Sequence, residues 1–171
     1  MKKTQRIENT SGEGKPFLKW VGGKTQLLDE IFQTIPQAFW ARGEVNYIEP
    51  FVGGGAVLFR LLREHLNISR AVINDVNPAL VAAYRCVQSA SEKLIAELSE
   101  IEREYFSLPA SEDARREFFL ARRVEFNGYV GDQRGKDFSE KIRVAALLIF
   151  LNRTCFNGLF RVNARGEFNV P

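Results

Sequence analysis

Hydrophobic residues in the first half of the chain alternate between a helical period and the short apolar runs of strands. Apolar positions recur every three or four residues over 24–35, which predicts a helix that Pro36 ends. Short apolar runs at 45–48 and 70–74 predict two strands, and a helical pattern over 56–66 lies between them. Strands and helices that alternate in this way are typical of a parallel, doubly wound α/β sheet.

Between residues 78 and 151 the pattern is mainly helical. Asn77 followed by Pro78 is an N-cap with proline at the first helical position, and it predicts a helix over 78–88. Three further helices are expected at 92–106, 112–126 and 140–151. Their expected N-caps, whose hydroxyls can accept a hydrogen bond from the first turn, are Ser91, Ser111 and Ser139.

The last residues predict a β-hairpin at about 153–171. Asn157-Gly158 and Arg165-Gly166 favour tight turns, and β-prone residues surround them. Three arginines and aromatics that look exposed make this segment resemble a probe of a DNA groove more than a buried connection. A polar, glycine-rich run at 128–136 is expected to be a mobile loop, and a plain connector and a DNA-contacting role stay equally open for it.

These elements together predict an α/β fold. It is a partial Rossmann-like sheet with a helical insertion that carries the C-terminal β-hairpin. The expected parts are a flexible arm at 1–15, an α/β part at 16–90 and a helical part at 91–171.

Composition narrows the class of protein only slightly. The chain has 171 residues, about the length of one domain, and no apolar run approaches the roughly 18 residues that cross a membrane. Its net charge of +3 is mild support for a polyanionic partner. After Glu140 five cations stand against the single acid Glu167, although charge alone favours an ordinary solvated surface.

Cysteine and histidine usage argues against disulfides and metals. Cys86 and Cys155 lie far apart in the sequence, which favours unpaired thiols in a reducing cytosol. His65 is the only histidine, and no ligand spacing surrounds it, so we expect no metal site. The charged start has no apolar segment after it and is unlike a signal peptide, so we expect a cytoplasmic protein.

The strongest chemical pattern joins the two predicted strands. The first strand runs through Glu49-Pro50-Phe51 into Gly53-Gly54-Gly55, and the second ends at Asp75. In a nucleoside-binding α/β sheet, glycines in the first βα turn let backbone N–H groups reach the ligand. An acid about 20 residues further on, at the tip of the next strand, takes the ribose hydroxyls. Alone, the glycines also fit a simple tight turn and Asp75 a helix cap.

Two other nucleotide motifs do not fit. A dinucleotide fingerprint requires glycine or alanine where this chain has Leu58, which disfavours a nicotinamide enzyme. A phosphate-binding P-loop ending at Lys24 requires glycine where this chain has Leu18. What remains upstream is an aromatic residue and a cation, Trp20 and Lys24, beside a glycine pair, and both also fit ordinary packing.

Four segments, in order, resemble the motifs of the Dam-type (alpha class) DNA N6-adenine methyltransferases. They are 17–24, 49–55, 73–77 and 152–171. The resemblance implies a methyltransferase-type sheet that binds S-adenosyl-L-methionine. The residues it implies for the cofactor are Trp20, Lys24 and Phe51 around the pocket, Gly53 and Gly55 in the turn, and Asp75 at the ribose.

The resemblance also implies recognition of a short adenine-containing target, often GATC, in double-stranded DNA. Phe156 matches an aromatic wedge, although tyrosine is expected there, and Arg161 matches an arginine that reads guanine. Bidentate contact of arginine with guanine is worth about 1–3 kcal/mol of discrimination, and an apolar wedge helps to offset unstacking when adenine is flipped. The other hairpin positions implied at the DNA are Asn157, Leu159 and Pro171.

The family's catalytic Asp-Pro-Pro-Tyr loop is missing from this sequence, because none of its six prolines is next to another. We therefore expect an N-terminal part of such an enzyme, inactive alone and with no catalytic residue of its own. A sheet lacking its later strands would expose an edge and an apolar face, inviting self-association or binding of the missing half. The alternatives are a non-catalytic DNA-binding or interaction module derived from such an enzyme and, third, a nucleotide-dependent oxidoreductase.

Overall fold

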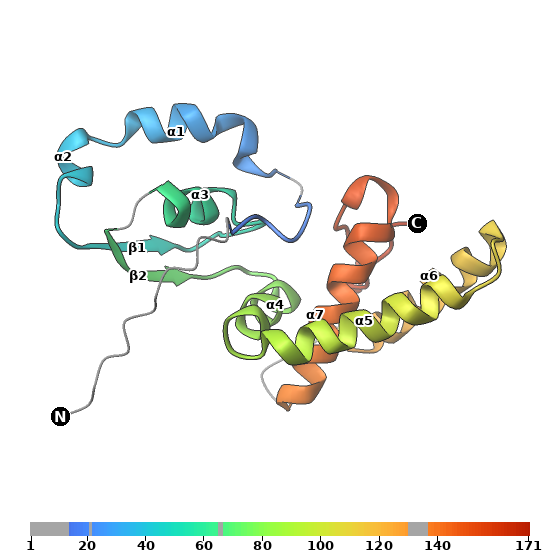
Figure 1. The fold of residues 1–171 in the computed structure, drawn as a ribbon. Helices are drawn as coiled ribbons and strands as arrows, with labels where there is room; N and C mark the ends of the chain where they lie inside the picture. The colour runs from blue at the N-terminus through green and yellow to red at the C-terminus, as the bar shows by residue number, and fades with distance from the viewer. Residues whose placement is uncertain (1–13, 21, 65–66, 130–136) are drawn as a thin grey trace, which may run out of the picture.

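The computed structural model of the chain describes residues 14–20, 22–64, 67–129 and 137–171. Figure 1 shows an α/β part, in blue and green, beside a bundle of longer helices in yellow to red. The arm predicted at 1–15 lies outside the described residues up to residue 13, and so does most of the glycine-rich run. The mixed α/β class is confirmed.

The α/β part holds two parallel strands with helices between and before them. Its elements are η1 (Lys24–Leu27), α1 (Leu28–Thr34), α2 (Gln37–Trp40), β1 (Val45–Glu49), α3 (Ala56–Glu64) and β2 (Ile68–Ile73). The strands pair with Tyr47 opposite Ala71 and Glu49 opposite Ile73. Because the strands are parallel, both carboxyl ends lie at one edge of the sheet, where the glycine turn and Asp75 follow.

The helical part packs around one central helix. Its elements are α4 (Pro78–Ser89), α5 (Ser91–Ser107), α6 (Glu112–Gly128), α7 (Phe138–Thr154) and η2 (Phe156–Gly158). Helix α7 is buried over most of its length, and α4, α5 and α6 surround it (Figure 1). A helix that is apolar on all sides needs such a cover. Helix α4 belongs to this bundle and also follows β2, so it joins the two parts.

The predicted helix caps are confirmed at two positions and wrong at two. Asn77 Oδ1 accepts hydrogen bonds from two N–H groups of α4, and Ser111 Oγ accepts from Ala114 N. Residue 91 is already inside α5, since only Ala90 separates that helix from α4. Asp137, rather than Ser139, caps α7, because its carboxylate accepts from both Glu140 N and the Ser139 hydroxyl.

The C-terminal hairpin is shorter and more buried than the sequence suggests. Helix α7 runs to Thr154 and η2 follows it, so antiparallel pairing covers only 161–169. Asn163 forms the turn, because its side-chain oxygen accepts from Arg165 N and Glu167 N. Phe168 is 2% exposed and packs in the core, so the expectation of exposed aromatics is wrong for this residue, whereas it holds for Phe156. Burial of this ring fixes the hairpin against the bundle.

The outer face of the small sheet is open. Ile48 is 69% exposed and Val72 is 41% exposed, both unusual for strand residues of their kind. A cleft of about 650 Å³ lies between α3, β2 and α4 and is lined mainly by apolar side chains. None of the helices in the described ranges is long and apolar enough to cross a membrane.

Candidate cofactor and DNA site

The turn after β1 is closely packed and depends on glycine. Gly53 and Gly55 have φ values of 50° and 78°, a backbone region that favours glycine. A Cβ on Gly55 would lie 2.5 Å from the Tyr84 hydroxyl oxygen, and one on Gly54 would lie 3.1 Å from Trp20 Cβ. A side chain at Gly55 would therefore clash, and one at Gly54 would require Trp20 to shift slightly.

Asp75 is hydrogen-bonded to the glycine turn. Its Oδ2 accepts from Gly53 N at 3.0 Å, and its Oδ1 accepts from Asn77 N at 2.9 Å. The carboxylate thus connects the turns that follow β1 and β2. Each oxygen has a second lone pair, so the group can still accept hydroxyl donors.

Trp20 packs against the same turn. Its ring lies against Gly53 and stacks on Phe160 with the ring centroids 5.0 Å apart. The hollow that remains between Trp20, Lys24 and the turn is about 20 Å³. A nucleoside is far larger, so it would lie at the rim of this hollow unless the indole moves. Phe51, two residues before Gly53 in the sequence, is 71% exposed.

The structure adds two site residues that were not predicted. Glu49 lines the hollow with Lys24 and accepts a hydrogen bond from the Tyr47 hydroxyl at 2.7 Å. Burial raises the pKa of Glu49, although the bond from Tyr47 and the charge of Lys24 partly oppose this. Glu49 lies in the motif segment 49–55, but the sequence alone predicted no function for it. Its place in that segment could have marked it as a candidate site residue.

Tyr84 supports the glycine turn from α4. Its hydroxyl donates to Gly53 O at 3.0 Å, and its ring meets Phe17 edge to face. Burial raises the pKa of this hydroxyl, and the nearby charges of Glu49 and Asp75 add to the shift. Nothing in the local sequence marks Tyr84, because its partner is 31 positions away.

The predicted DNA residues lie around one end of α7. Phe156 is 65% exposed, and its N–H donates to Pro171 O at 2.9 Å, which brings these two residues together. Asn157 is exposed with a φ of 54°, whereas Leu159 is half-buried against the core. Arg161 is exposed, and its Nε donates to Asn169 Oδ1 across the hairpin.

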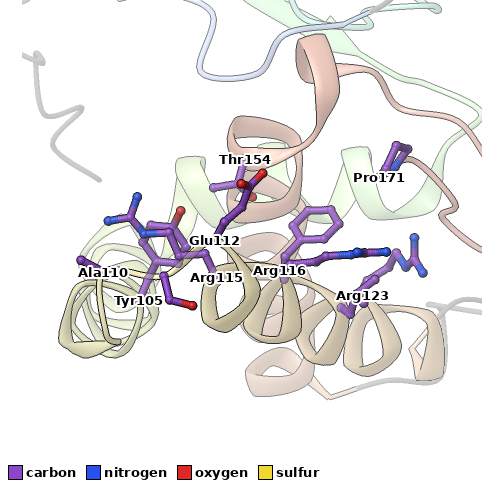
Figure 2. A pocket seen from close by; sticks show the side chains of 11 residues that line it. Tyr105, Ala110, Glu112, Arg115, Arg116, Arg123, Thr154 and Pro171 are labelled. Carbon is purple, nitrogen blue, oxygen red and sulfur yellow. The ribbon is translucent and has the colours of Figure 1, made fainter.

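A cationic cleft of about 650 Å³ lies beside Pro171. Figure 2 shows Arg115, Arg116 and Arg123 on α6, with Pro171 at one side of the cleft. Arg123 Nη1 donates to Val170 O at 3.4 Å. The cleft therefore extends the positive surface beyond the hairpin.

Part of the positive charge near the C-terminus is neutralised inside the molecule. Arg143 donates to both carboxylate oxygens of Glu125 and to Glu97. The hydrogen bonds that it donates to Glu125 raise the pKa of this guanidinium despite partial burial. Arg143 is thus a structural cation, and Arg161 and Arg165 carry the exposed charge of the hairpin.

Thiol and metal chemistry find no support in the described part of the chain. Cys86 and Cys155 are buried free thiols, and burial raises the pKa of each. High thiol pKa values make poor nucleophiles. Over the same residues, no group of three His, Cys, Asp or Glu side chains is placed to hold a metal ion.

Comparison with known proteins gives one consistent result. Residues 20–171 match the model of the D12 class N6 adenine-specific DNA methyltransferases. The chain is 45% identical over 159 residues to the type II methyltransferase M.MjaIII of Methanocaldococcus jannaschii, covering 93% of this chain and 52% of that protein. It is 35% identical to the DNA adenine methylase of Escherichia coli K12 over 93% of this chain and 48% of that protein.

A longer relative matches in the same way. The chain is 33% identical to the DNA N-6-adenine-methyltransferase of Escherichia phage P1, over 98% of this chain and 19% of that protein. The chain spans about half the length of the first relatives it matches.

Proposed function

Because the chain belongs to the D12 class N6 adenine-specific DNA methyltransferase family, we propose that it carries the cofactor-binding and target-reading parts of a site-specific DNA adenine-N6 methyltransferase. The cofactor is S-adenosyl-L-methionine. The observation that carries this proposal is the hydrogen bond from Gly53 N to the Asp75 carboxylate, because it joins the two cofactor elements of a nucleoside-binding sheet.

Charges around the glycine turn suit the two ends of the cofactor. Asp75 offers carboxylate oxygens to the ribose hydroxyls. Lys24 and Glu49 line the hollow beside the turn and suit the carboxylate and ammonium groups of a methionyl moiety. Trp20 and Phe51 supply aromatic surface for the adenine ring. When bound, the cofactor supplies a sulfonium methyl group, and these residues hold it in place and exclude water.

Double-stranded DNA fits the exposed surface of the turn after α7 and of the hairpin. Phe156 is exposed in η2, just after α7, and suits a wedge between base pairs, and Arg161 suits a guanine edge. Arg115 and Arg116 in the adjoining cleft suit backbone phosphates. The target is a short adenine-containing site.

Methyl transfer needs a loop that this sequence does not contain. An Asp-Pro-Pro-Tyr segment, absent here, would hydrogen-bond and stack on the flipped adenine. We therefore expect this chain alone to be inactive. The exposed β2 edge and the apolar cleft beside it suit a polypeptide that completes the sheet, or a second copy of this chain.

Binding and turnover together test the proposal. Titration calorimetry with S-adenosylhomocysteine should show binding that Asp75→Ala weakens and Asp113→Ala, an exposed α6 control, leaves unchanged. Gel shifts should show duplex DNA binding. Absence of both interactions would contradict the proposal, and binding of NADH alone would favour the oxidoreductase.

One observation favours a second function, a non-catalytic DNA-binding module. The hollow at the glycine turn is only about 20 Å³, whereas the hairpin is well packed. Radiolabelled methyl transfer to unmethylated duplex separates the functions once a polypeptide carrying the Asp-Pro-Pro-Tyr half of a relative is added. Turnover supports the enzyme, and DNA binding without cofactor binding supports the module.

A further inference from the structure

Asn152 is a buried polar residue that the proposed function does not use. Its side chain is 0% exposed, near the end of α7. Its Nδ2 donates to Lys19 O at 2.7 Å and to Gly158 O at 2.8 Å, and its Oδ1 accepts from Lys19 N at 2.8 Å. Both amide donors and the acceptor are therefore engaged, and leaving any of them unpaired in the core would be costly.

The amide joins two segments that are 139 positions apart at their contact point. Lys19 lies directly before Trp20 in the segment 17–24, which we call the cofactor block. Gly158 ends the turn at 156–158, which carries Phe156 and Asn157 and which we call the reading turn. The contact is tight, because a Cβ on Gly158 would lie 2.7 Å from Lys19 Cβ. Gly158 also has a φ of 65°, so its backbone has little freedom to adjust around a side chain.

Two neighbouring contacts tie the same segments together. Trp20 stacks on Phe160 with an interplanar angle of 19°. Arg153, the next residue after Asn152, donates from Nη2 to Phe17 O at 3.0 Å. A displacement of the reading turn should therefore move the backbone of the cofactor block as well.

We propose that Asn152 is a positioning residue that couples target reading to cofactor binding, an inference that rests on the proposed function. DNA that moves the turn at 156–158 shifts Lys19 through this amide, and Lys19 carries Trp20 with it over the glycine turn. Coupling between two binding sites is reciprocal, so cofactor binding strengthens DNA binding by the same factor.

Asn127 provides a matched control. Its Nδ2 donates to Phe168 O at 3.0 Å, and its Oδ1 accepts from Phe168 N at 2.8 Å. The chemistry is the same, an asparagine amide that clamps a backbone segment. Both of its partners, however, lie within the helical part and its hairpin. Breaking this clamp frees the backbone of Phe168 but removes no hydrogen bond to residues 17–20, which Phe168 reaches only indirectly, through the ring of Phe160.

Hydrogen–deuterium exchange of the ligand-free chain tests the connection. Asn152→Asp sets a carboxylate oxygen against two carbonyl oxygens, so exchange should rise together at 17–20 and 156–160. Asn127→Asp should raise exchange only near 163–170. If Asn152→Asp raises exchange in one of its two segments alone, the segments are not coupled through this side chain and the inference fails.

Ligand titrations test the functional side, with Trp20 as the reporter in a Trp40→Phe background. Duplex DNA should change Trp20 emission and tighten S-adenosylhomocysteine binding about fivefold or more, the lower range of measured couplings. Asn152→Asp should reduce this factor to about one, whereas Asn127→Asp should weaken DNA binding and keep the factor.

The outcomes separate this inference from the proposed function. A wild-type chain that binds both ligands with no mutual effect overturns the inference and leaves the proposed function standing. A chain that binds neither ligand overturns both. If Asn152→Asp does not fold, Asn152→Ala removes the amide without setting a carboxylate against two carbonyl oxygens; it should also reduce the factor to about one, and a factor kept at its wild-type value overturns the inference.

Discussion

Gly53 donates its backbone N–H to the carboxylate of Asp75 at 3.0 Å, although the two residues are 22 positions apart. The bond places the acid at the end of one strand directly against the glycine turn of its neighbour. A nucleoside-binding sheet requires a glycine turn and an acid at this edge, and the bond brings the two together.

Asp75→Asn tests the role of this carboxylate with little change in shape. Hydrogen bonds to charged groups contribute about 1.5–3 kcal/mol, so we expect S-adenosylhomocysteine to bind roughly ten- to a hundredfold more weakly. Titration calorimetry measures the change. Asp113→Asn on the exposed face of α6 is the control, and equal affinity of Asp75→Asn and wild type would exclude Asp75 from the cofactor site.

Gly55→Ala tests whether the turn requires glycine. The φ of 78° and the approach of the Tyr84 hydroxyl both oppose a side chain. Backbone strain of this kind costs about 1–3 kcal/mol, and we expect at least that loss in the free energy of unfolding by urea. Gly43→Ala is the control, since nothing lies within 4 Å of a Cβ there. Two variants of equal stability would show that the turn is not constrained.

Local chemistry was readable from the sequence, and distant contacts were not. The Asn77 cap, the two strands and the position of Asp75 just after the second strand follow from residues near each other in the chain. Ser139 was predicted as a cap because it is a good one, but Asp137 lies two residues earlier and binds the same helix end more strongly. A local sequence pattern does not show which of two neighbouring candidate N-caps will bind the end of the helix.

The sequence did not predict the roles of residues whose partners are distant in the chain. Tyr84 and Asn152 act on backbone groups 31 and 133 positions distant, and no spacing rule reaches them. The aromatics of the hairpin segment were expected to be exposed, yet Phe126 and Phe160 meet the ring of Phe168 in the folded chain. Tertiary packing decided each of these cases.

Glu49→Gln should stabilise the ligand-free chain at neutral pH. Burial raises the pKa of Glu49 in the folded state, so the folded chain holds that proton more tightly than the unfolded chain. Stability is then highest below the unfolded pKa and falls as pH rises through the folded pKa. Thermal unfolding should show the variant above wild type at pH 7, with the curves converging below about pH 4.

The same substitution should weaken cofactor binding, because Glu49 is proposed to hold an ammonium group. A variant that is less stable than wild type at pH 7 would show that the charged form of Glu49 is not disfavoured by folding.

Glu125→Gln should have the opposite pH dependence. Burial alone would raise the pKa of Glu125, but hydrogen bonds from Arg143 and Arg122 more than offset it and lower the pKa. This contribution is present above the unfolded pKa and is lost as pH falls through the folded pKa. Wild type should therefore be more stable at pH 7, and the difference should shrink in acid. Glu117→Gln, at an exposed α6 position, should show no such trend.

Arg161→Lys tests guanine reading by the hairpin. Lysine keeps the charge but loses bidentate contact, so discrimination should fall by about 1–3 kcal/mol. Competition between GATC duplexes with guanine and with 7-deazaguanine measures it. Arg103→Lys, at an exposed α5 position, is the control. If wild type does not distinguish the two duplexes, Arg161 does not read guanine N7.

The most direct test of the account is a crystal structure of the chain with S-adenosylhomocysteine. The account predicts that the ribose hydroxyls lie within hydrogen-bonding distance of the Asp75 carboxylate and that the nucleoside rests against the turn at Gly53–Gly55. A nucleoside bound elsewhere on the chain, with Asp75 still bonded only to Gly53 and Asn77, would contradict it.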